Sequence, residues 1–236
     1  MVDIIRSGRP RTDRQIPDVL PAPPPRLAVP AGAAMLAAVV LIAVLLRDPG
    51  SSAIQSVDDS WAGGMPGSSG GALSVLATVV EAGLGGPTGL MAPLGLVGWL
   101  LVCRRHWSAL YALTTCVLAN LVLVLPLKDA VDRAHPEDPW TLVSGGSFPS
   151  GHAFTAAALV VVLGALVCRQ ASRRRWWWVG LCFVATVMWS GTWVRDSWLS
   201  DTVAGALVGA GTALLLWRAF APLLRREALG AAAGPG

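Results

Sequence analysis

Residues 147–152, Ser-Phe-Pro-Ser-Gly-His, combine a histidine, hydroxyl groups and a bare glycine backbone at the start of a long apolar segment. Pro149 favours the first turn of a helix, and Ser150 and Gly151 then leave free backbone N–H groups at the helix start. Such groups bind anions, because they carry the positive end of the helix dipole. His152 adds a side chain that exchanges protons near neutral pH. The pattern predicts a phosphate-handling helix start, although these residues alone also fit a capped helix with a surface histidine.

Two further clusters carry side chains suited to phosphate chemistry. Residues 128–136 read Lys-Asp-Ala-Val-Asp-Arg-Ala-His-Pro, and residues 190–201 read Ser-Gly-Thr-Trp-Val-Arg-Asp-Ser-Trp-Leu-Ser-Asp. Cations and backbone donors stabilise phosphate oxygens, and a histidine can give a proton to a leaving oxygen. The candidate side chains in these clusters are Lys128, Arg133, His135, Arg195, Ser197 and Asp201.

Metal and cofactor chemistry is not indicated by the sequence. No carboxylate pair and no His/Cys cluster has the spacing of metal ligands, so we expect no metal and no other cofactor. The four cysteines lack paired spacing and lie in or beside apolar segments, which favours small core residues over disulfides or a zinc site.

The composition is that of a membrane protein. The chain is 54% hydrophobic and 14% charged, with a mean hydropathy of +0.59. The net charge of +4 does not indicate nucleic-acid binding, because the basic residues form short clusters between apolar segments.

Apolar segments predict an all-α, multi-pass bundle of six transmembrane helices. The predicted spans cover residues 27–46, 88–103, 107–127, 150–168, 176–192 and 199–217. Residues 72–84 are apolar but short and contain Glu81, so we predict an interfacial or buried helix and not a span; the alternative is that they begin the next span. Residues 1–26 are predicted as a disordered cytoplasmic tail, 27–217 as the membrane domain and 218–236 as a second cytoplasmic tail.

The distribution of basic residues predicts the orientation. Fourteen of the 18 Lys and Arg residues fall in the segments that this topology places inside, so we expect both termini in the cytoplasm and a location in the plasma or inner membrane. The clusters around Lys128, His152 and Asp201 then share the outer face. Ionisable groups at a membrane edge are costly unless they are used or paired, which favours a functional pocket there.

These residues resemble the motifs of the type 2 phosphatidic acid phosphatase family, the membrane relatives of vanadium haloperoxidases. Residues 149–152 match the second motif, Pro-Ser-Gly-His, in full. Lys128 and Pro136 match the ends of the first, Lys-x6-Arg-Pro, and Ser190 and Asp201 match the ends of the third, Ser-Arg-x5-His-x3-Asp. The order of the motifs, their outer side and the six spans also agree, so the resemblance covers roughly residues 27–217.

The resemblance implies a role for each residue that matches a family motif, and it also shows which motif residues are replaced in this chain. His152 would be the general acid, and Lys128, Ser150 and Gly151 would contact phosphate. His135 and Gly191 replace family arginines, and Ser197 replaces the histidine that attacks phosphorus. Asp201 keeps its position but has lost the histidine that the family carboxylate orients.

Several replacements remain open from the sequence. Arg133 and Arg195 can each move a guanidinium into a vacated place, or pair with neighbouring aspartates or lipid headgroups. Ser197 can attack phosphorus if a histidine acts as its base, or can cap the sixth span. His135 or a water molecule are the other candidate nucleophiles.

The expected function is that of a lipid phosphate or polyprenyl (pyro)phosphate phosphatase with altered chemistry, a hydrolase acting at the outer membrane face. A phosphotransferase is a related possibility. The alternative is a catalytically inactive relative that binds lipid phosphates or a membrane protein partner.

Overall fold

The computed structural model describes residues 23–47, 53–65, 70–84, 86–140, 145–168 and 172–232, and in these ranges the chain forms helices and no strand. The helices are α1 (Ala28–Leu45), α2 (Ala53–Gly63), α3 (Ala72–Leu84), α4 (Gly86–Val102), α5 (His106–Leu113), α6 (Leu125–Val131), α7 (Gly151–Leu166), α8 (Arg173–Trp193) and α9 (Leu199–Ala232). Two π-helical segments, η2 (Thr114–Leu118) and η3 (Asn120–Val124), join α5 to α6. The predicted all-α class is confirmed. Most of the predicted N-terminal tail, residues 1–22, lies outside the described ranges.

Within the described ranges, three helical stretches are long and apolar enough to cross a bilayer: α1, residues 106–131 and residues 199–231. Shorter apolar helices cover residues 72–83, 89–102 and 151–166. The surface around the sides of the helix bundle is apolar as well. Val40 and Leu41 of α1, for example, are 60% and 59% exposed, as lipid-facing side chains are. The chain is therefore a polytopic membrane protein, as the composition predicts.

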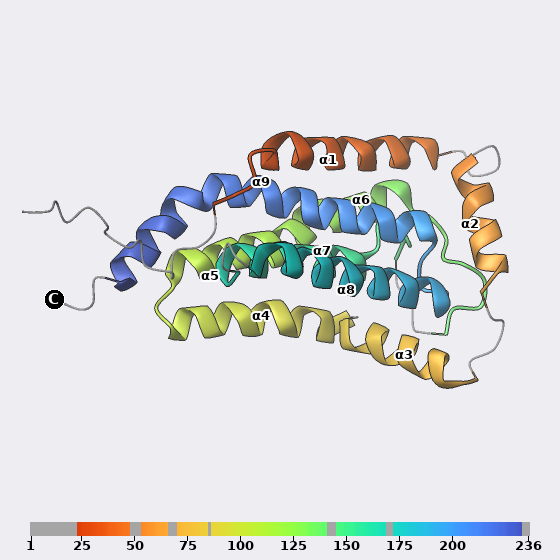
Figure 1. Ribbon diagram of the computed structural model, residues 1–236. Helices are drawn as coiled ribbons and strands as arrows, with labels where there is room; N and C mark the ends of the chain where they lie inside the picture. The colour runs from red at the N-terminus through yellow and green to blue at the C-terminus, as the bar shows by residue number, and fades with distance from the viewer. Residues whose placement is uncertain are drawn as a thin grey trace, which may run out of the picture.

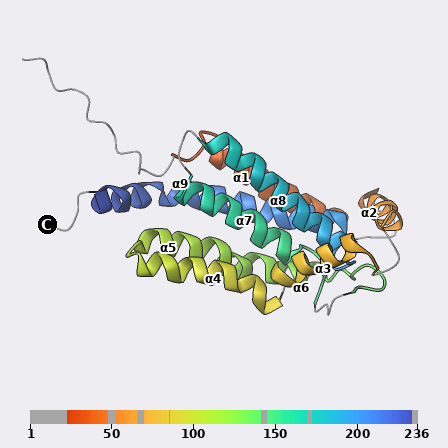
Figure 2. The same cartoon turned by 60° about the horizontal axis from the view of Figure 1, so that its bottom comes forward.

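Helices α3 and α4 lie end to end along one side of the bundle (Figures 1 and 2). Of the two alternatives that the sequence leaves open for residues 72–84, this arrangement agrees with the one in which they begin the next apolar stretch. Glu81 lies on the last turn of α3 and is buried.

Helix α7 lies inside the bundle, packed against α8 and α9 (Figure 2). Its side chains are mostly small, and twelve of its 16 residues are buried. Gly205 and Gly209 lie one turn apart on α9, where an added Cβ would come within 2.2 Å of the Ser150 carbonyl oxygen and 2.3 Å of the Phe154 carbonyl oxygen. The two bare backbones therefore meet directly, as small residues allow between membrane helices.

Helix α9 continues well beyond the predicted sixth span and ends at Ala232 (Figure 1). Its extension packs against the start of α5. Glu227 accepts hydrogen bonds from the backbone N–H groups of Trp107 and Ser108, at 2.7 and 3.2 Å, and so satisfies free donors at that helix end. This contact between distant parts of the chain explains why residues 218–232 are helical and not a simple tail.

Helix α2 lies across the end of the bundle where α6 and α8 end and α7 and α9 begin (Figure 1). The sequence predicts an outer loop over residues 47–71, so this amphipathic helix is an addition to the predicted fold. Its buried side chain is Asp58, which faces the candidate residues below it.

Candidate active site

The candidate residues from all three sequence clusters lie at this same end of the bundle (Figure 1). The first cluster lies on α6, which carries Lys128, and on the segment after α6, which carries Arg133 and His135. The second cluster, Ser150, Gly151 and His152, forms the start of α7. The third cluster spans the α8–α9 connection, with Arg195 and Ser197, and the first turn of α9, with Asp201. The structure thus brings together segments that are up to about seventy residues apart in the chain.

Ser150 is the N-cap of α7, as its position after Pro149 predicts. Its backbone is extended, and its hydroxyl accepts a hydrogen bond from the backbone N–H of Ala153 at 3.5 Å. Its own N–H donates to the Asp201 carbonyl at 3.0 Å, which ties the start of α7 to the first turn of α9. The cap thus uses the Ala153 N–H, and the backbone N–H groups of Gly151 and His152 are the candidate donors to an anion at this helix start.

His152, on the first turn of α7, lies between two carboxylates. Its Nδ1 contacts Oε1 of Glu81 from α3, and lies 3.5 Å from Oδ2 of Asp196 in the α8–α9 connection. The other Glu81 oxygen accepts a hydrogen bond from the Ser190 hydroxyl at 2.9 Å. The imidazole is therefore oriented by carboxylates from two separate elements, and Ser190 of α8 in turn holds Glu81.

Asp196 joins this cluster to Ser197, whose hydroxyl donates to Asp196 Oδ2 at 3.1 Å. Burial acts to raise the pKa of Asp196, but hydrogen bonds from His152 and Ser197 and the charges of His152 and His135 outweigh burial and lower the pKa below its usual range. Asp196 is therefore a carboxylate that stays ionised and a poor acceptor of protons.

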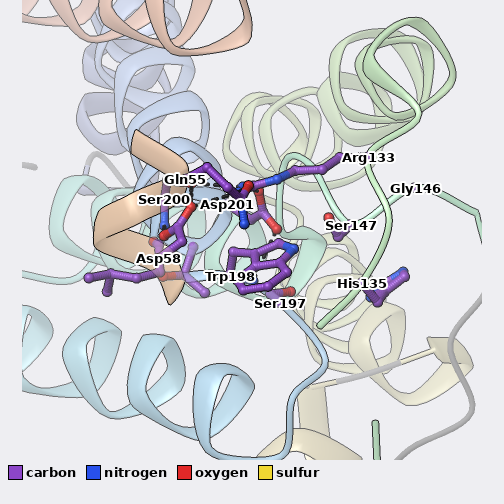
Figure 3. A network of polar contacts seen from close by, with 12 residues as sticks. Gln55, Asp58, Arg133, His135, Gly146, Ser147, Ser197, Trp198, Ser200 and Asp201 are labelled. Carbon is purple, nitrogen blue, oxygen red and sulfur yellow. Dashed lines mark hydrogen bonds and ion pairs between the residues drawn. The ribbon is translucent and has the colours of Figure 1, made fainter. Parts of the chain in front are cut away.

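Arg133 lies in a second, buried network beneath α2 (Figure 3). Its guanidinium contacts Asp201 at 2.5 Å and Asp58 at 2.7 Å, and it donates to Gln55 at 2.6 Å and Ser200 at 2.8 Å. The Trp198 ring lies 5.2 Å from the guanidinium carbon, within cation–π range.

The partners of Arg133 differ from those that the sequence offers as structural alternatives, Asp129 and Asp132. Arg133 pairs with Asp58 and with Asp201, the carboxylate that has lost its family histidine. Asp58 was missed because it lies in a predicted loop far away in sequence. The one signal was the adjacent pair Asp58 and Asp59 in that loop.

Lys128 and His135 hold the loop that precedes α7. Lys128 Nζ donates to the Gly146 carbonyl at 2.5 Å, and Ser147 N–H donates to the Arg133 carbonyl at 2.8 Å. Nδ1 of His135 contacts the Asp196 carbonyl, and Nε2 lies 3.1 Å from the Gly145 carbonyl. Both ring nitrogens of His135, which stands at the position of a family arginine, therefore face backbone carbonyl oxygens.

The remaining third-cluster residues are arranged differently from the family pattern. Arg195 adopts a left-handed backbone, with φ of 59°, and donates to the Glu137 carbonyl at 3.2 Å. Gly191 stands at the position of a family arginine, and a Cβ there would be in ordinary van der Waals contact with the two Glu81 oxygens, at 3.6 and 3.8 Å. Where the motif provides a cation, this chain therefore presents a carboxylate.

Glu81, like Asp58 and Asp196, is a residue of the site that the sequence analysis did not identify. A lone carboxylate in an apolar helix was the available signal, because such groups are rarely buried unless they are paired. Its partners, His152 and Ser190, are 71 and 109 residues away, and the chain order gives no sign of their contact.

Comparisons with known proteins identify a matching family and a similar solved fold. The sequence model described as PAP2 superfamily matches residues 105–225. A solved structure, the first transmembrane PAP2-type phosphatidylglycerolphosphate phosphatase from Bacillus subtilis, is similar with a TM-score of 0.63 and 20% sequence identity. The alignment covers 81% of this chain and 98% of that one, and at this identity it shows a shared fold. A comparison with curated proteins finds no significant match.

Proposed function

The chain belongs to the PAP2 superfamily, and on that premise we propose that it is a phosphatase of lipid phosphates or polyprenyl (pyro)phosphates. It hydrolyses a phosphomonoester or pyrophosphate at the outer face of the membrane. The observation that carries the proposal is the start of α7, where Ser150 caps the helix and His152 stands on its first turn, oriented by Glu81 and Asp196.

In the proposed reaction the substrate phosphate lies against the free N–H groups at the start of α7, beside Ser150 and Gly151. Lys128, whose Nζ donates to the Gly146 carbonyl at 2.5 Å, turns to a phosphate oxygen when the substrate binds. Arg195 is a second cation on the same connection as Ser197. His152 gives a proton to the leaving oxygen of the lipid alcohol.

Water is the nucleophile that the side-chain contacts support best. The Ser197 hydroxyl donates to Asp196, and a carboxylate of lowered pKa takes up a proton poorly. Both nitrogens of His135 face backbone carbonyls, so this ring must leave both contacts before it can attack. Positioning and electrostatic stabilisation alone still give substantial catalysis, although less than a covalent route.

A lipid substrate fits the surroundings of the site. Helices α1, α2 and α9 line an open apolar hollow of about 450 Å³, whose lining includes Ile54 and Leu199 and reaches Asp58 and Ser200 of the buried network. An acyl or isoprenoid chain matches such a lining. The distribution of basic residues supports the plasma or inner membrane as location, with both termini in the cytoplasm.

The second candidate function is a binding protein without turnover, for a lipid phosphate or a membrane protein partner. The observation that favours it is that Arg133 forms buried ion pairs with both Asp201 and Asp58. In this arrangement the motif carboxylate orients no histidine.

Phosphate release by the purified full-length protein in detergent separates the two functions. The substrate panel contains phosphatidic acid, phosphatidylglycerol phosphate and polyprenyl mono- and diphosphates, with binding of each lipid measured in parallel. Release from at least one lipid is the expected result. Binding of phosphorylated lipids without release from any of them would favour the binding protein, and neither binding nor release would refute both functions.

A further inference from the structure

Glu81 is a buried carboxylate on a helix that lies outside the three sequence clusters. Its side chain is 2% exposed, and its Oε1 contacts Nδ1 of His152. Helix α3, which carries it, precedes residues 105–225, the part of the chain that the family model matches. We infer that Glu81 is a positioning residue of the proposed phosphatase: it holds the hydrogen on Nδ1 of His152 and so keeps Nε2 ready to protonate the leaving oxygen.

The burial of Glu81 is the first argument. Its Oε1 makes no hydrogen bond to any other described group, and no Lys or Arg among the described residues forms an ion pair with this carboxylate. An ionised carboxylate at this depth needs a positive partner, because removing an unpaired charge from water is expensive. Protonated His152 is that partner, so the contact stabilises the form of the imidazole that can donate a proton.

The second oxygen of Glu81 is also held in place. Its Oε2 accepts a hydrogen bond from the Ser190 hydroxyl at 2.9 Å, and the same hydroxyl lies 2.8 Å from the Val187 carbonyl oxygen. Ser190 is buried and begins the third sequence cluster. A carboxylate contacted at both oxygens holds the ring that it faces, so α3 and α8 together determine which nitrogen of the imidazole remains for the substrate.

Asp196 is the weaker of the two carboxylates that His152 faces. Its Oδ2 lies 3.5 Å from Nδ1, and its side chain is 15% exposed. The charges of His135 and Lys128 also act on Asp196. Glu81 is closer to the imidazole and more deeply buried, so water screens its charge less. The larger part of the orienting effect on His152 therefore comes from Glu81.

The proposed step leaves one hydrogen on the ring and transfers the other. Water attacks phosphorus, and the bond from phosphorus to the lipid oxygen breaks with its electron pair on that oxygen, which takes the proton from Nε2 of His152. Both hydrogens of the water stay on the product phosphate, and one of them then returns to Nε2. The hydrogen on Nδ1 remains between His152 and Glu81. With Gln in place of Glu81, the protonated ring loses its nearest counter-charge.

The test compares two leaving groups, because only a poor leaving group needs the proton. The full-length protein in detergent is assayed for phosphate release from phosphatidic acid, which leaves as an alkoxide, and from para-nitrophenyl phosphate, whose phenolate leaves without a proton. Glu81→Gln should lower kcat about tenfold or more for phosphatidic acid and less than about threefold for the aryl ester. The ratio of the two rates is independent of the folded fraction, so a partial loss of fold does not imitate this result.

Two further variants complete this comparison. Glu81→Asp keeps a carboxylate and should regain part of the rate on phosphatidic acid. Glu137→Gln removes an exposed carboxylate at the same end of the bundle and should match the wild type on both substrates. An equal loss on both substrates in Glu81→Gln, or no loss on either, would contradict the positioning role.

A measurement without substrate separates this inference from the proposed function on which it rests. The chain has three histidines, so ¹⁵N-labelled histidine gives few nuclear magnetic resonance signals, and His152→Ala identifies those of His152. We expect a far-downfield hydrogen on Nδ1 that moves upfield in Glu81→Gln, because a neutral amide accepts a weaker hydrogen bond. Its presence in a wild type that releases no phosphate from any substrate would refute the proposed function alone. Its absence from the wild type would overturn the inference, whatever the activity.

Discussion

Arg133 provides the sharpest test of what the buried network does. Its side chain is 5% exposed, and its partners Asp58 and Asp201 are 1% and 0% exposed. Replacing Arg133 by Met leaves two carboxylates buried without their cation. Removing one partner of a buried ion pair costs about 3–5 kcal/mol.

That cost translates into a measurable shift. For a chain of this size, 1 kcal/mol corresponds to about 2–4 °C in Tm, so Arg133→Met should unfold roughly 6–20 °C below the wild type. The 11 tryptophans give an intrinsic fluorescence signal for thermal unfolding in detergent. Arg133→Lys keeps the charge but loses the fork geometry, and should lie between the two.

Arg195→Met is the matched control, because Arg195 is partly exposed and its Nη1 donates to a backbone carbonyl. Its Tm should change by less than about 2 °C. A similar small change for Arg133→Met would refute the structural role of Arg133. A large loss of lipid-phosphate affinity at unchanged Tm would instead assign Arg133 to the phosphate, as the sequence allowed.

Other substitutions test the packing, the charge state and the altered motif. Gly205→Ala places a Cβ against the Ser150 carbonyl and should cost about 1–3 kcal/mol of stability. Its control is Gly98→Ala, whose Cβ meets nothing within 4 Å and which should leave Tm nearly unchanged. Equal effects of the two substitutions on Tm would contradict the close approach of α7 and α9. The pKa of Asp196 is lowered in the folded protein, so its ionised form contributes stability that is present above about pH 4 and is lost as the pH falls. Acid titration of unfolding should therefore show a smaller loss between about pH 5 and pH 3 in Asp196→Asn than in the wild type, and parallel curves would exclude this linkage. Restoring the family residues with Ser197→His and Gly191→Arg should raise phosphate release, by restoring a nucleophile and a cation; unchanged release would show that the pocket no longer places a phosphate beside residue 197.

The sequence predicted the fold class, and it predicted that the three candidate clusters meet at one end of the bundle. Apolar runs and short basic clusters are local signals, so the helices around residues 150–166 and 107–127 lie close to where they were expected. The extension of α9 to Ala232 was not predicted, because it depends on the contact of Glu227 with the start of α5. Helix α2 was missed because its polar, glycine-flanked sequence resembles a loop.

The part of the candidate site that a contiguous motif encodes could be predicted from the sequence. The part that depends on contacts between distant residues could not. The start of α7 is encoded by four neighbouring residues, and the structure has the cap that they predict. Asp58 and Glu81 were not assigned to the site, since their partners lie 75 and 71 residues away. Whether Ser150, Gly151, Lys128 and Arg195 contact phosphate stays a prediction.

The most direct measurement compares phosphate release by the wild type, His152→Ala and His106→Ala under identical conditions. His106 begins α5 at the opposite end of the bundle from His152, so it controls for loss of an imidazole away from the site. The wild type and His106→Ala should release phosphate from the same lipid, and His152→Ala should release it at least about a hundredfold more slowly. Release that survives in His152→Ala would contradict a phosphatase site at the start of α7.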